Sequence, residues 1–346
     1  MNEVVSLEPA LAARLPRHAP LVVSTRGGAV ENVHYGSYVV VDGQGRRLAA
    51  AGDADFPVFT RSALKPFQAL PLVAHPRFAE LGLTRTEIAL LCASHNGEPR
   101  HAEAARALLA RAGLTEAALQ CGVHTPYWYA HNDTRPPEGA RWSALHHNCS
   151  GKHSGMLLLA WLEGADPARY LERDHPVQRR IAEAVAYAAG ELDAEAMTWG
   201  TDGCSAPNYA LPLAGLARAA AWLTRPNPDP RYGEAPRIIF DAMVTHPEMV
   251  SGEGRHDLDY ALAGGGDWIS KVGAEGVQIL ASRRHGAALA VKIADGSPKA
   301  LTVATCAVLC RLGWVDPAQA EHLARWASFP IRSIRGVEVG RLSALL

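Results

Sequence analysis

Serine and lysine occur in this sequence at a spacing that suits nucleophilic catalysis. Ser62 and Lys65 form the pattern Ser-x-x-Lys, which places a hydroxyl and an amine on the same face of a helix. A neutral lysine in an apolar pocket can take the proton of a serine hydroxyl while that hydroxyl attacks a carbonyl carbon. The spacing therefore predicts an acyl-transfer site. The alternative is an ordinary surface helix that begins near Ser62, because the spacing alone is weak evidence and such a pair can also arise by chance.

The scarcity of lysine strengthens this interpretation. Five of the 34 basic residues are lysine and the other 29 are arginine. Arginine keeps its proton in proteins, whereas a buried lysine can lose its proton and act as a base. In a sequence that uses arginine for most of its basic positions, each retained lysine is a candidate for chemistry that arginine cannot perform. The five are Lys65, Lys152, Lys271, Lys292 and Lys299.

Two further motifs follow the first one along the chain. Ser94-His-Asn96 has the pattern Ser-x-Asn, and Lys271-Val-Gly273 has the pattern Lys-x-Gly. Serine β-lactamases and penicillin-binding proteins carry three motifs of these kinds in the same order. Two departures are the histidine in place of aspartate in the second motif and the valine in place of threonine in the third. The order nevertheless favours a Ser-Lys acyl-transfer site.

A second group of reactive side chains lies in two polar segments. Cys149, Lys152 and His153 belong to a histidine-rich run, and Cys204 belongs to a later glycine-containing run. The cysteine spacing does not match a zinc ribbon or a zinc finger. A structural role, a metal site, and a Cys149 nucleophile with His147 or His153 as its base all stay open at this point. A lysine at the start of a helix opposes the helix dipole, which favours a specific partner for Lys152.

Hydrophobic periodicity predicts the elements that must position these motifs. Alternating apolar residues predict strands near both ends of the chain, and helical spacing predicts a helical middle, which together indicate an α+β fold. We expect a single two-lobed domain over residues 1–346, with a sheet lobe from about 20–60 and 265–346 and a helical lobe from about 61–264. The predicted strands are 21–25, 36–42, 47–52, 268–272, 277–282 and 287–293. The predicted helices are 62–74, 84–92, 100–112, 152–162, 177–189, 208–223, 235–245 and 299–312.

Composition excludes several classes of protein. The 346 residues carry 34 basic and 35 acidic side chains, a net charge of -1, which gives no basic surface for nucleic acid. No apolar run reaches the roughly 18 residues of a membrane span. The segment Met1–Pro20 lacks the apolar run of a secretory signal, and the six cysteines are too dispersed for a disulfide framework. We therefore expect a cytoplasmic protein with reduced thiols and with neither nucleic-acid nor membrane partners.

As a set, the motifs resemble those of the second, Rhizobium-type family of bacterial L-asparaginases. The similar stretches follow the family's order from about residue 20 to residue 335, and their specificity comes from the set rather than from any single motif. They are Ser24–Gly36, Thr60–Pro66, Cys92–Glu98, His147–Met156, Thr201–Pro207 and Lys271–Gly276.

The resemblance implies a fold, an activity and a catalytic set. The fold is similar to that of serine β-lactamases and penicillin-binding proteins, an antiparallel sheet with flanking helices plus a helical lobe. The activity is hydrolysis of L-asparagine to L-aspartate and ammonia, through an acyl-enzyme on serine. The implied catalytic residues are Ser62, Lys65, Ser94 and Lys271, and either serine could be the one that attacks.

The resemblance also implies a zinc ion and a substrate-binding set. Members of this family hold a zinc ion with two cysteines and a lysine. The resemblance places these three ligands at Cys149, Lys152 and Cys204 in this sequence. Arg61 is placed to pair with the substrate carboxylate, and His153 and Asp202 are placed to contact the substrate α-amino group or to support the metal. Asn96 of the Ser-x-Asn motif completes the substrate-binding set, and a homodimer is expected. The implied residues outside the catalytic set are Arg61, Asn96, Cys149, Lys152, His153, Asp202 and Cys204.

Other functions stay open on the sequence alone. A glutaminase or a penicillin-recognising serine hydrolase would use the same Ser-Lys motifs. A zinc-dependent or cysteine-dependent amidase would place the chemistry at Cys149 and Cys204 instead. A binding module without catalysis would bind substrate and release no ammonia.

Overall fold

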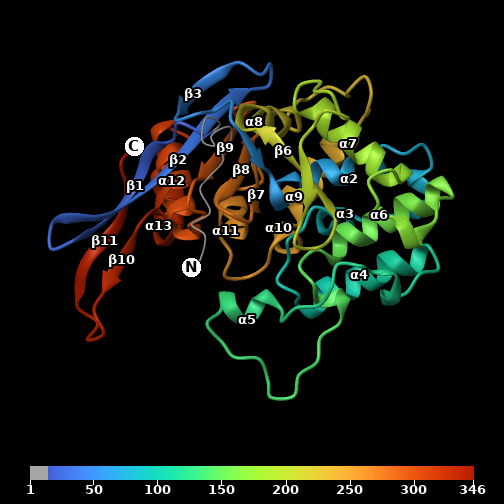
Figure 1. Cartoon of the computed structure of the whole chain (residues 1–346), viewed down its shortest axis with the longest axis horizontal. Coiled ribbons are helices and arrows are strands. Elements are labelled where there is room, and N and C mark those ends of the chain that lie inside the picture. The colour runs from blue at the N-terminus through green and yellow to red at the C-terminus, as the bar shows by residue number, and fades with distance from the viewer. Residues whose placement is uncertain (1–14) are drawn as a thin grey trace, which may run out of the picture.

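An eight-stranded antiparallel sheet is assembled from the two ends of the chain in this computed structural model, which describes residues 15–346 (Figure 1). Seven strands follow the order β10-β11-β1-β2-β9-β8-β7, and β3 pairs with β2 beside this path. The six strands predicted from alternation are confirmed. They are β1 (Ala19–Arg26), β2 (Ala29–Asp42), β3 (Arg47–Ala51), β7 (Trp268–Gly273), β8 (Val277–Ser282) and β9 (Ala287–Ile293).

The alternation within the strands divides their side chains between two cores. In β2, Val39 and Val41 face the core that is shared with the helical lobe, whereas Tyr38 and Val40 face the opposite core. Helix α8 (Leu213–Trp222) packs on the first face and helix α12 (Pro298–Arg311) on the second. Because helices cover both faces, strands β8 and β9 are buried along almost their whole length.

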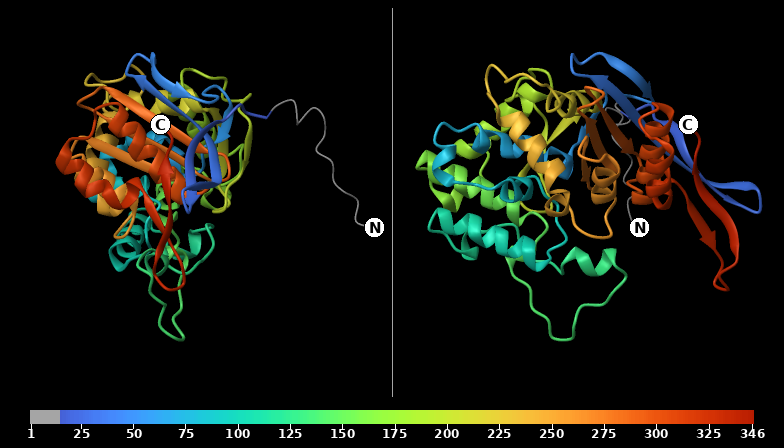
Figure 2. Two further views of the ribbon diagram at one scale, coloured as in Figure 1. Left: turned by 90° about the vertical axis from the view of Figure 1, so that its left-hand side faces the viewer. Right: turned by 180° about the vertical axis from the view of Figure 1, so that it is seen from behind.

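The middle of the chain forms a helical lobe beside the sheet (Figure 2). Helix α2 is buried at every residue, so it forms the centre of this lobe. Thr84 begins α3 with a capping box, in which its hydroxyl and the Glu87 carboxylate satisfy free backbone N–H groups. The main helices are α2 (Lys65–Val73), α3 (Arg85–Leu91), α4 (Pro99–Arg111), α6 (Ser150–Glu163), α7 (Pro176–Ala188), α9 (Ala235–Thr245), α10 (Pro247–Val250) and α11 (His256–Ala263). The predicted α+β class, an antiparallel sheet with flanking helices and a helical lobe, is confirmed.

The helix predicted over 208–223 is wrong in its first part. Strand β6 (Pro207–Pro212) occupies this part and pairs with β4 (Pro57–Phe59) and β5 (Trp199–Thr201), and α8 begins only at Leu213. Pro212 has no N–H for a helical hydrogen bond, and a proline also restricts the residue before it to extended conformations. The resulting three-stranded sheet lies next to the segment that carries Ser62.

The last part of the chain holds three elements that the sequence did not predict. Helix α13 (Pro317–Ala327) precedes a hairpin of β10 (Phe329–Arg332) and β11 (Glu338–Ala344), and β11 pairs with β1. The hairpin and the β1–β2 ribbon extend beyond the helices (Figure 2). In both hairpin strands every residue except Leu342 is half-buried or exposed, so no run of buried apolar residues marks them in the sequence.

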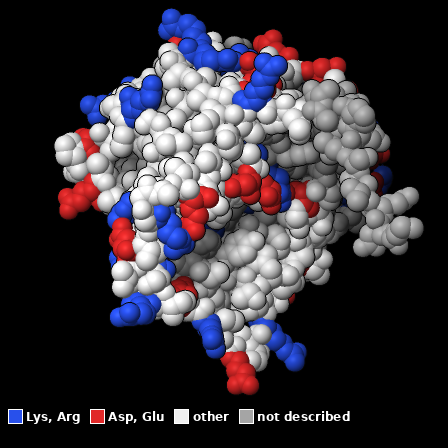
Figure 3. Space-filling model, turned by 60° about the vertical axis from the view of Figure 1, so that its left-hand side comes forward, with Lys and Arg blue, Asp and Glu red and all other residues white. Residues whose placement is uncertain are grey.

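The described surface is mixed in charge. Acidic and basic side chains lie close to one another around the hollowed face in Figure 3, without an extended patch of one sign among the coloured residues. Within residues 15–346, no helix has the length and apolarity that crossing a membrane requires. The segment Met1–Pro20, for which the sequence indicates no secretory signal, falls largely outside the described residues.

Candidate active site

Ser62 lies on a short, conformationally strained turn before helix α2. The turn is a 3-10 helix (Arg61–Leu64), and Arg61 has a φ of 49°, in the left-handed region that non-glycine residues rarely adopt. The Asn208 side chain holds this residue from both sides: its oxygen accepts the Arg61 N–H at 3.1 Å, and its amide donates to the Arg61 carbonyl at 3.1 Å. Such strain persists only where the surroundings impose it, and it is common at active sites.

Strand β7 approaches this turn so closely that only glycine fits at its end. A Cβ atom on Gly273 would lie 2.6 Å from the Thr60 carbonyl oxygen. The glycine of the Lys-x-Gly motif therefore brings β7 against the backbone that carries Ser62, and Lys271 comes with it. The motif's glycine serves close packing between two catalytic segments.

Lys65 contacts Ser94 rather than Ser62. Its buried Nζ donates to the Ala93 carbonyl at 2.5 Å, to the Ser94 hydroxyl at 2.8 Å and to the Cys149 sulfur at 3.2 Å. No hydrogen bond joins Ser62 and Lys65 in the part of the chain that the structure describes. These three bonds direct the Lys65 amine toward Ser94 and Cys149, away from Ser62.

Lys271 is the second buried lysine of the site. Its side chain is fully buried, and Nζ donates to the Val272 carbonyl at 2.7 Å. Burial lowers the pKa of Lys271 to about 7, because a charged amine loses its hydration there; the charges of Lys65 and Arg255 act in the same direction, and the Asp257 carboxylate opposes them. A lysine with this pKa is available as a base near neutral pH.

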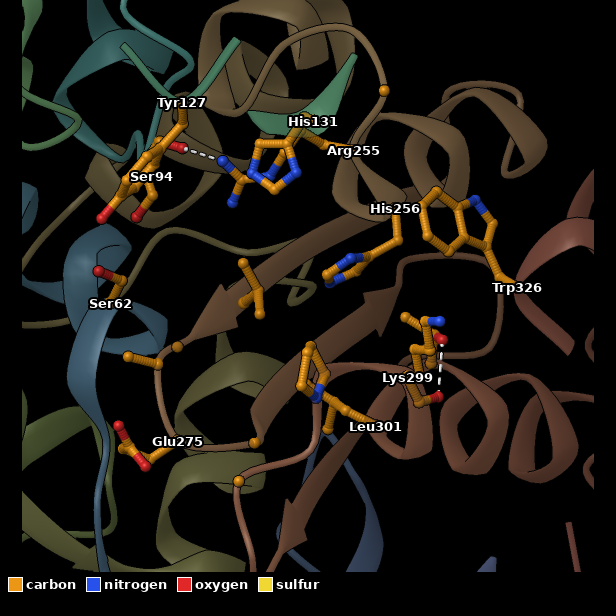
Figure 4. Close-up of a pocket in the computed structure, with 18 of the residues that line it drawn as sticks. Ser62, Ser94, Tyr127, His131, Arg255, His256, Glu275, Lys299, Leu301 and Trp326 are labelled. Atoms are coloured by element: carbon orange, nitrogen blue, oxygen red, sulfur yellow. Dashed lines mark hydrogen bonds between the residues drawn. The ribbon is translucent and has the colours of Figure 1, made fainter. Parts of the chain in front are cut away.

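A cavity of about 490 Å³ opens at the two serines. Ser62 and Ser94 lie at one end of it, and it extends toward Trp326 and Lys299 (Figure 4). A second cavity of about 480 Å³ lies on the other side of Arg61, and Glu275 lines both. Two serines therefore line a cavity of the size that binds small molecules, with Lys65 bonded to one of them and Lys271 on the strand that packs against the turn of the other.

Comparison with protein families decides what this arrangement belongs to. The profile of the L-asparaginase II family matches residues 22–344, nearly the whole chain. The chain belongs to the L-asparaginase II family. The family resemblance identified from the motifs is thereby confirmed, and the chain is an asparaginase-type amidohydrolase of a small-molecule substrate.

Solved structures give more distant similarities. A β-lactamase from Mycobacterium bovis aligns at 17% identity over 80% of this chain and 94% of its own, with a TM-score of 0.42. The protein Mglu in its native form aligns at 16% identity over 81% of this chain and 65% of its own, with a TM-score of 0.36. The search of curated proteins finds no match.

The residues that the family resemblance assigns to zinc come together beside Lys65. Helix α6 packs directly on the end of α3, since a Cβ on Gly151 would lie within 2.3 Å of the Leu90 carbonyl oxygen, and this packing buries the start of α6. Lys152 Nζ lies 2.9 Å from Cys204 Sγ. A hydrogen bond with Cys204 lowers the pKa of Cys149 well below that of a free thiol, against the effect of burial.

This donor set fits a metal ion. It contains a thiol that favours the thiolate form, a second thiol and an amine, and buried His153 Nε2 beside it has no hydrogen-bond partner among the described residues. Thiolate and neutral nitrogen are the ligand types that zinc prefers. No three His, Cys, Asp or Glu side chains within residues 15–346 are arranged to hold a metal, so a metal here would depend on the lysine.

The expected substrate-binding residues fall into different surroundings. Arg61 Nε pairs with Asp202 at 2.6 Å, and this pair lines the second cavity. His153 is buried, and its Nδ1 contacts the Tyr170 hydroxyl at 2.7 Å. Asn96 does not line the first cavity; its amide donates to the Glu253 carbonyl at 2.8 Å, so it fixes the backbone next to Arg255.

Two charged residues of the site carried no signal in the sequence. Asp257 is buried at the start of α11, and its carboxylate accepts from the Ser270 hydroxyl at 2.6 Å and from the Val272 N–H at 2.9 Å. Arg255 Nη1 donates to the Ser94 carbonyl at 3.2 Å (Figure 4). A single acid or arginine in a polar segment is typical of a solvated surface, and only the fold buries these two.

Proposed function

We propose that the chain hydrolyses L-asparagine to L-aspartate and ammonia through an acyl-serine intermediate. The observation that carries the proposal is the position of Ser62 and Ser94 at one end of the same cavity, with Lys65 bonded to Ser94 and buried Lys271 on the strand that packs against the Ser62 turn. Family membership supports an amidohydrolase, and the Arg61–Asp202 pair supplies one charge for each α-group of an amino acid.

Ser62 attacks the side-chain amide carbon in this proposal. Its hydroxyl gives up a proton to neutral Lys271, while Lys65 holds the Ser94 hydroxyl in place for the transfer. This assignment differs from the roles expected from the motif alone, in which Lys65 was the base for Ser62. Ammonia leaves with a proton, and water then hydrolyses the ester and restores Ser62.

Zinc bound by Cys149, Lys152 and Cys204 forms part of the proposal. Lys152 must lose its proton to serve as a ligand, whereas the charges of Cys204 and Cys149 raise the pKa of that amine against the effect of burial. An ion held by these three residues would supply a positive charge near Lys65, which contacts Cys149. Metal analysis of the purified protein should find about one zinc per chain.

The test of the activity is ammonia release from asparagine, glutamine and a chromogenic β-lactam side by side. We expect asparagine to be preferred, and Ser62→Ala to abolish turnover while leaving the folded protein intact. Ser94→Ala is the matched variant at the same end of the cavity. Near wild-type turnover by Ser62→Ala would overturn the nucleophile assignment, and hydrolysis of the β-lactam alone would overturn the substrate.

We also propose that the protein is a homodimer in the cytoplasm. The proposal rests on the family resemblance. Light scattering of the purified protein tests it, and a mass of one chain at micromolar concentration would contradict it.

A further inference from the structure

The cavity at the serines is larger than asparagine requires. Its volume of about 490 Å³ lies in the range of sites for drug-sized ligands, whereas asparagine is a single small amino acid. Ser62 and Ser94 occupy one end only, and the remaining length reaches α12, α13 and β10 (Figure 4). A substrate that fills this length must carry a further group beyond the amide that is cleaved.

The lining defines the chemistry of that further group. Leu301, Trp326 and Phe329 give the far end of the lining an apolar and aromatic surface, and Lys299 stands at the rim with its Nζ 5.4 Å from the Phe329 ring centroid. His131, His256 and the cation Arg255 line the part between this end and the serines. Glu275, the acidic residue of the lining, lies at the Ser62 end (Figure 4). An apolar wall with a cation at its edge suits an apolar group that bears a carboxylate.

The second cavity suits the other half of the substrate, the amino-acid part that carries the α-ammonium and α-carboxylate groups. It is lined by charges of both signs, from Arg61 and Lys292 and from Asp202 and Glu275, which suit the ammonium and carboxylate of an amino acid. The two cavities adjoin at Glu275, whose carboxylate is 3.9 Å from Arg61 Nη1. A substrate with its α-groups toward the charged cavity therefore directs the departing amine into the apolar one.

We propose that the chain also cleaves dipeptides in which an aspartate is linked through its side-chain carboxyl to an apolar or aromatic amino acid. This inference rests on the proposed function. Ser62 forms an ester with the aspartyl carbonyl, the amide C–N bond breaks, and the departing amino group takes the proton that the serine lost. Water then cleaves the ester, which yields L-aspartate and the free amino acid.

The test compares β-aspartyl-phenylalanine with asparagine on the same purified enzyme. We expect kcat/KM for the dipeptide to lie within about tenfold of that for asparagine. Lys299→Ala should raise the KM for the dipeptide by up to about fivefold, the upper limit for an exposed ion pair, and should leave the KM for asparagine unchanged. Phe329→Ala should lower kcat/KM for the dipeptide about tenfold.

Two controls match these variants. Arg311→Ala removes an exposed cation at the opposite end of the same helix, outside the cavity, and should change neither substrate. In the C-terminal carboxamide of β-aspartyl-phenylalanine, the phenylalanine carboxylate is replaced by a neutral amide. Lys299→Ala should therefore leave the KM for this compound unchanged.

Each outcome separates the inference from the function on which it rests. Turnover of asparagine with dipeptide cleavage below about one-hundredth of that rate overturns the inference and leaves the asparaginase. Cleavage of the dipeptide that neither Lys299→Ala nor Phe329→Ala affects overturns the placement in this cavity. Turnover of neither substrate overturns both.

Discussion

The replacement Asp257→Asn tests whether the charge next to Lys271 sets the pH at which the enzyme works. Asparagine has the same size as aspartate and keeps an oxygen that can accept the Val272 N–H, so the change removes mainly the charge. In the wild type, burial lowers the pKa of Lys271 to about 7 and the Asp257 carboxylate opposes that effect. Loss of the carboxylate should therefore lower the pKa of Lys271 further.

The geometry gives the size of this change. Asp257 Oδ2 and Lys271 Nζ are 3.8 Å apart. At an effective dielectric constant of about 20, two unit charges at that distance interact with roughly 4 kcal/mol, which corresponds to about three pH units. The pKa of Lys271 should fall from about 7 to about 4 in the variant.

The assay is the pH dependence of kcat/KM for asparagine, which reports the essential groups of the free enzyme. Neutral Lys271 is the active form, so wild-type kcat/KM should rise with pH through about 7. At pH about 5.5 the wild type should keep about 3% of its plateau value, whereas Asp257→Asn should keep nearly all of its own plateau. The comparison uses each protein's own plateau, because loss of a buried charge also lowers stability.

Asp259→Asn is the matched control. Asp259 lies two residues further along α11 and binds Arg325 and Trp326 instead of Lys271. Its replacement should leave the acidic limb of the pH profile of kcat/KM near pH 7. A limb that stays near 7 in Asp257→Asn, or that moves equally in both variants, would refute the assignment of Lys271 as the base.

Four further predictions follow from the same contacts. Lys65→Arg should lower kcat at least about 1,000-fold, because the longer, planar guanidinium cannot reproduce the three bonds to Ala93, Ser94 and Cys149. Lys299→Arg should change asparagine turnover less than about twofold. Steady-state kinetics of both variants test this pair of predictions. Asn208→Ala should destabilise the fold by about 1–3 kcal/mol and lower kcat more than it raises KM, since it releases the strained Arg61 backbone; urea unfolding and kinetics measure the two effects. Gly273→Ala should cost about 1–3 kcal/mol, because its Cβ would meet the Thr60 carbonyl at 2.6 Å, and an unchanged melting temperature would contradict the close approach. Cys149→Ala should lose bound zinc in metal analysis, and full retention of metal would disprove its role as a ligand.

Local signals accounted for most of the fold. Strands β7, β8 and β9 and helices such as α4 are set by apolar periodicity and by capping residues, which act over a few positions along the chain. The boundary at Pro212 was the exception within this local range, because the apolar residues before it fit a strand and a helix equally well. The β10–β11 hairpin lay beyond such signals, since β11 is held by its pairing with β1 from the other end of the chain.

The candidate site divides in the same way. The sequence by itself determined which residues could perform the chemistry: the Ser-Lys motifs, their order, the rarity of lysine and the Cys/Lys cluster. Tertiary structure alone decided their partners. Helical spacing allows Lys65 to reach Ser62, but packing presents three hydrogen-bond partners from the end of α3 and the start of α6. A buried amine must use such partners, so the side chain turns toward them. The role of Asp257 has the same origin. Burial, which no short motif encodes, strengthens the interaction between its carboxylate and the Lys271 amine 3.8 Å away.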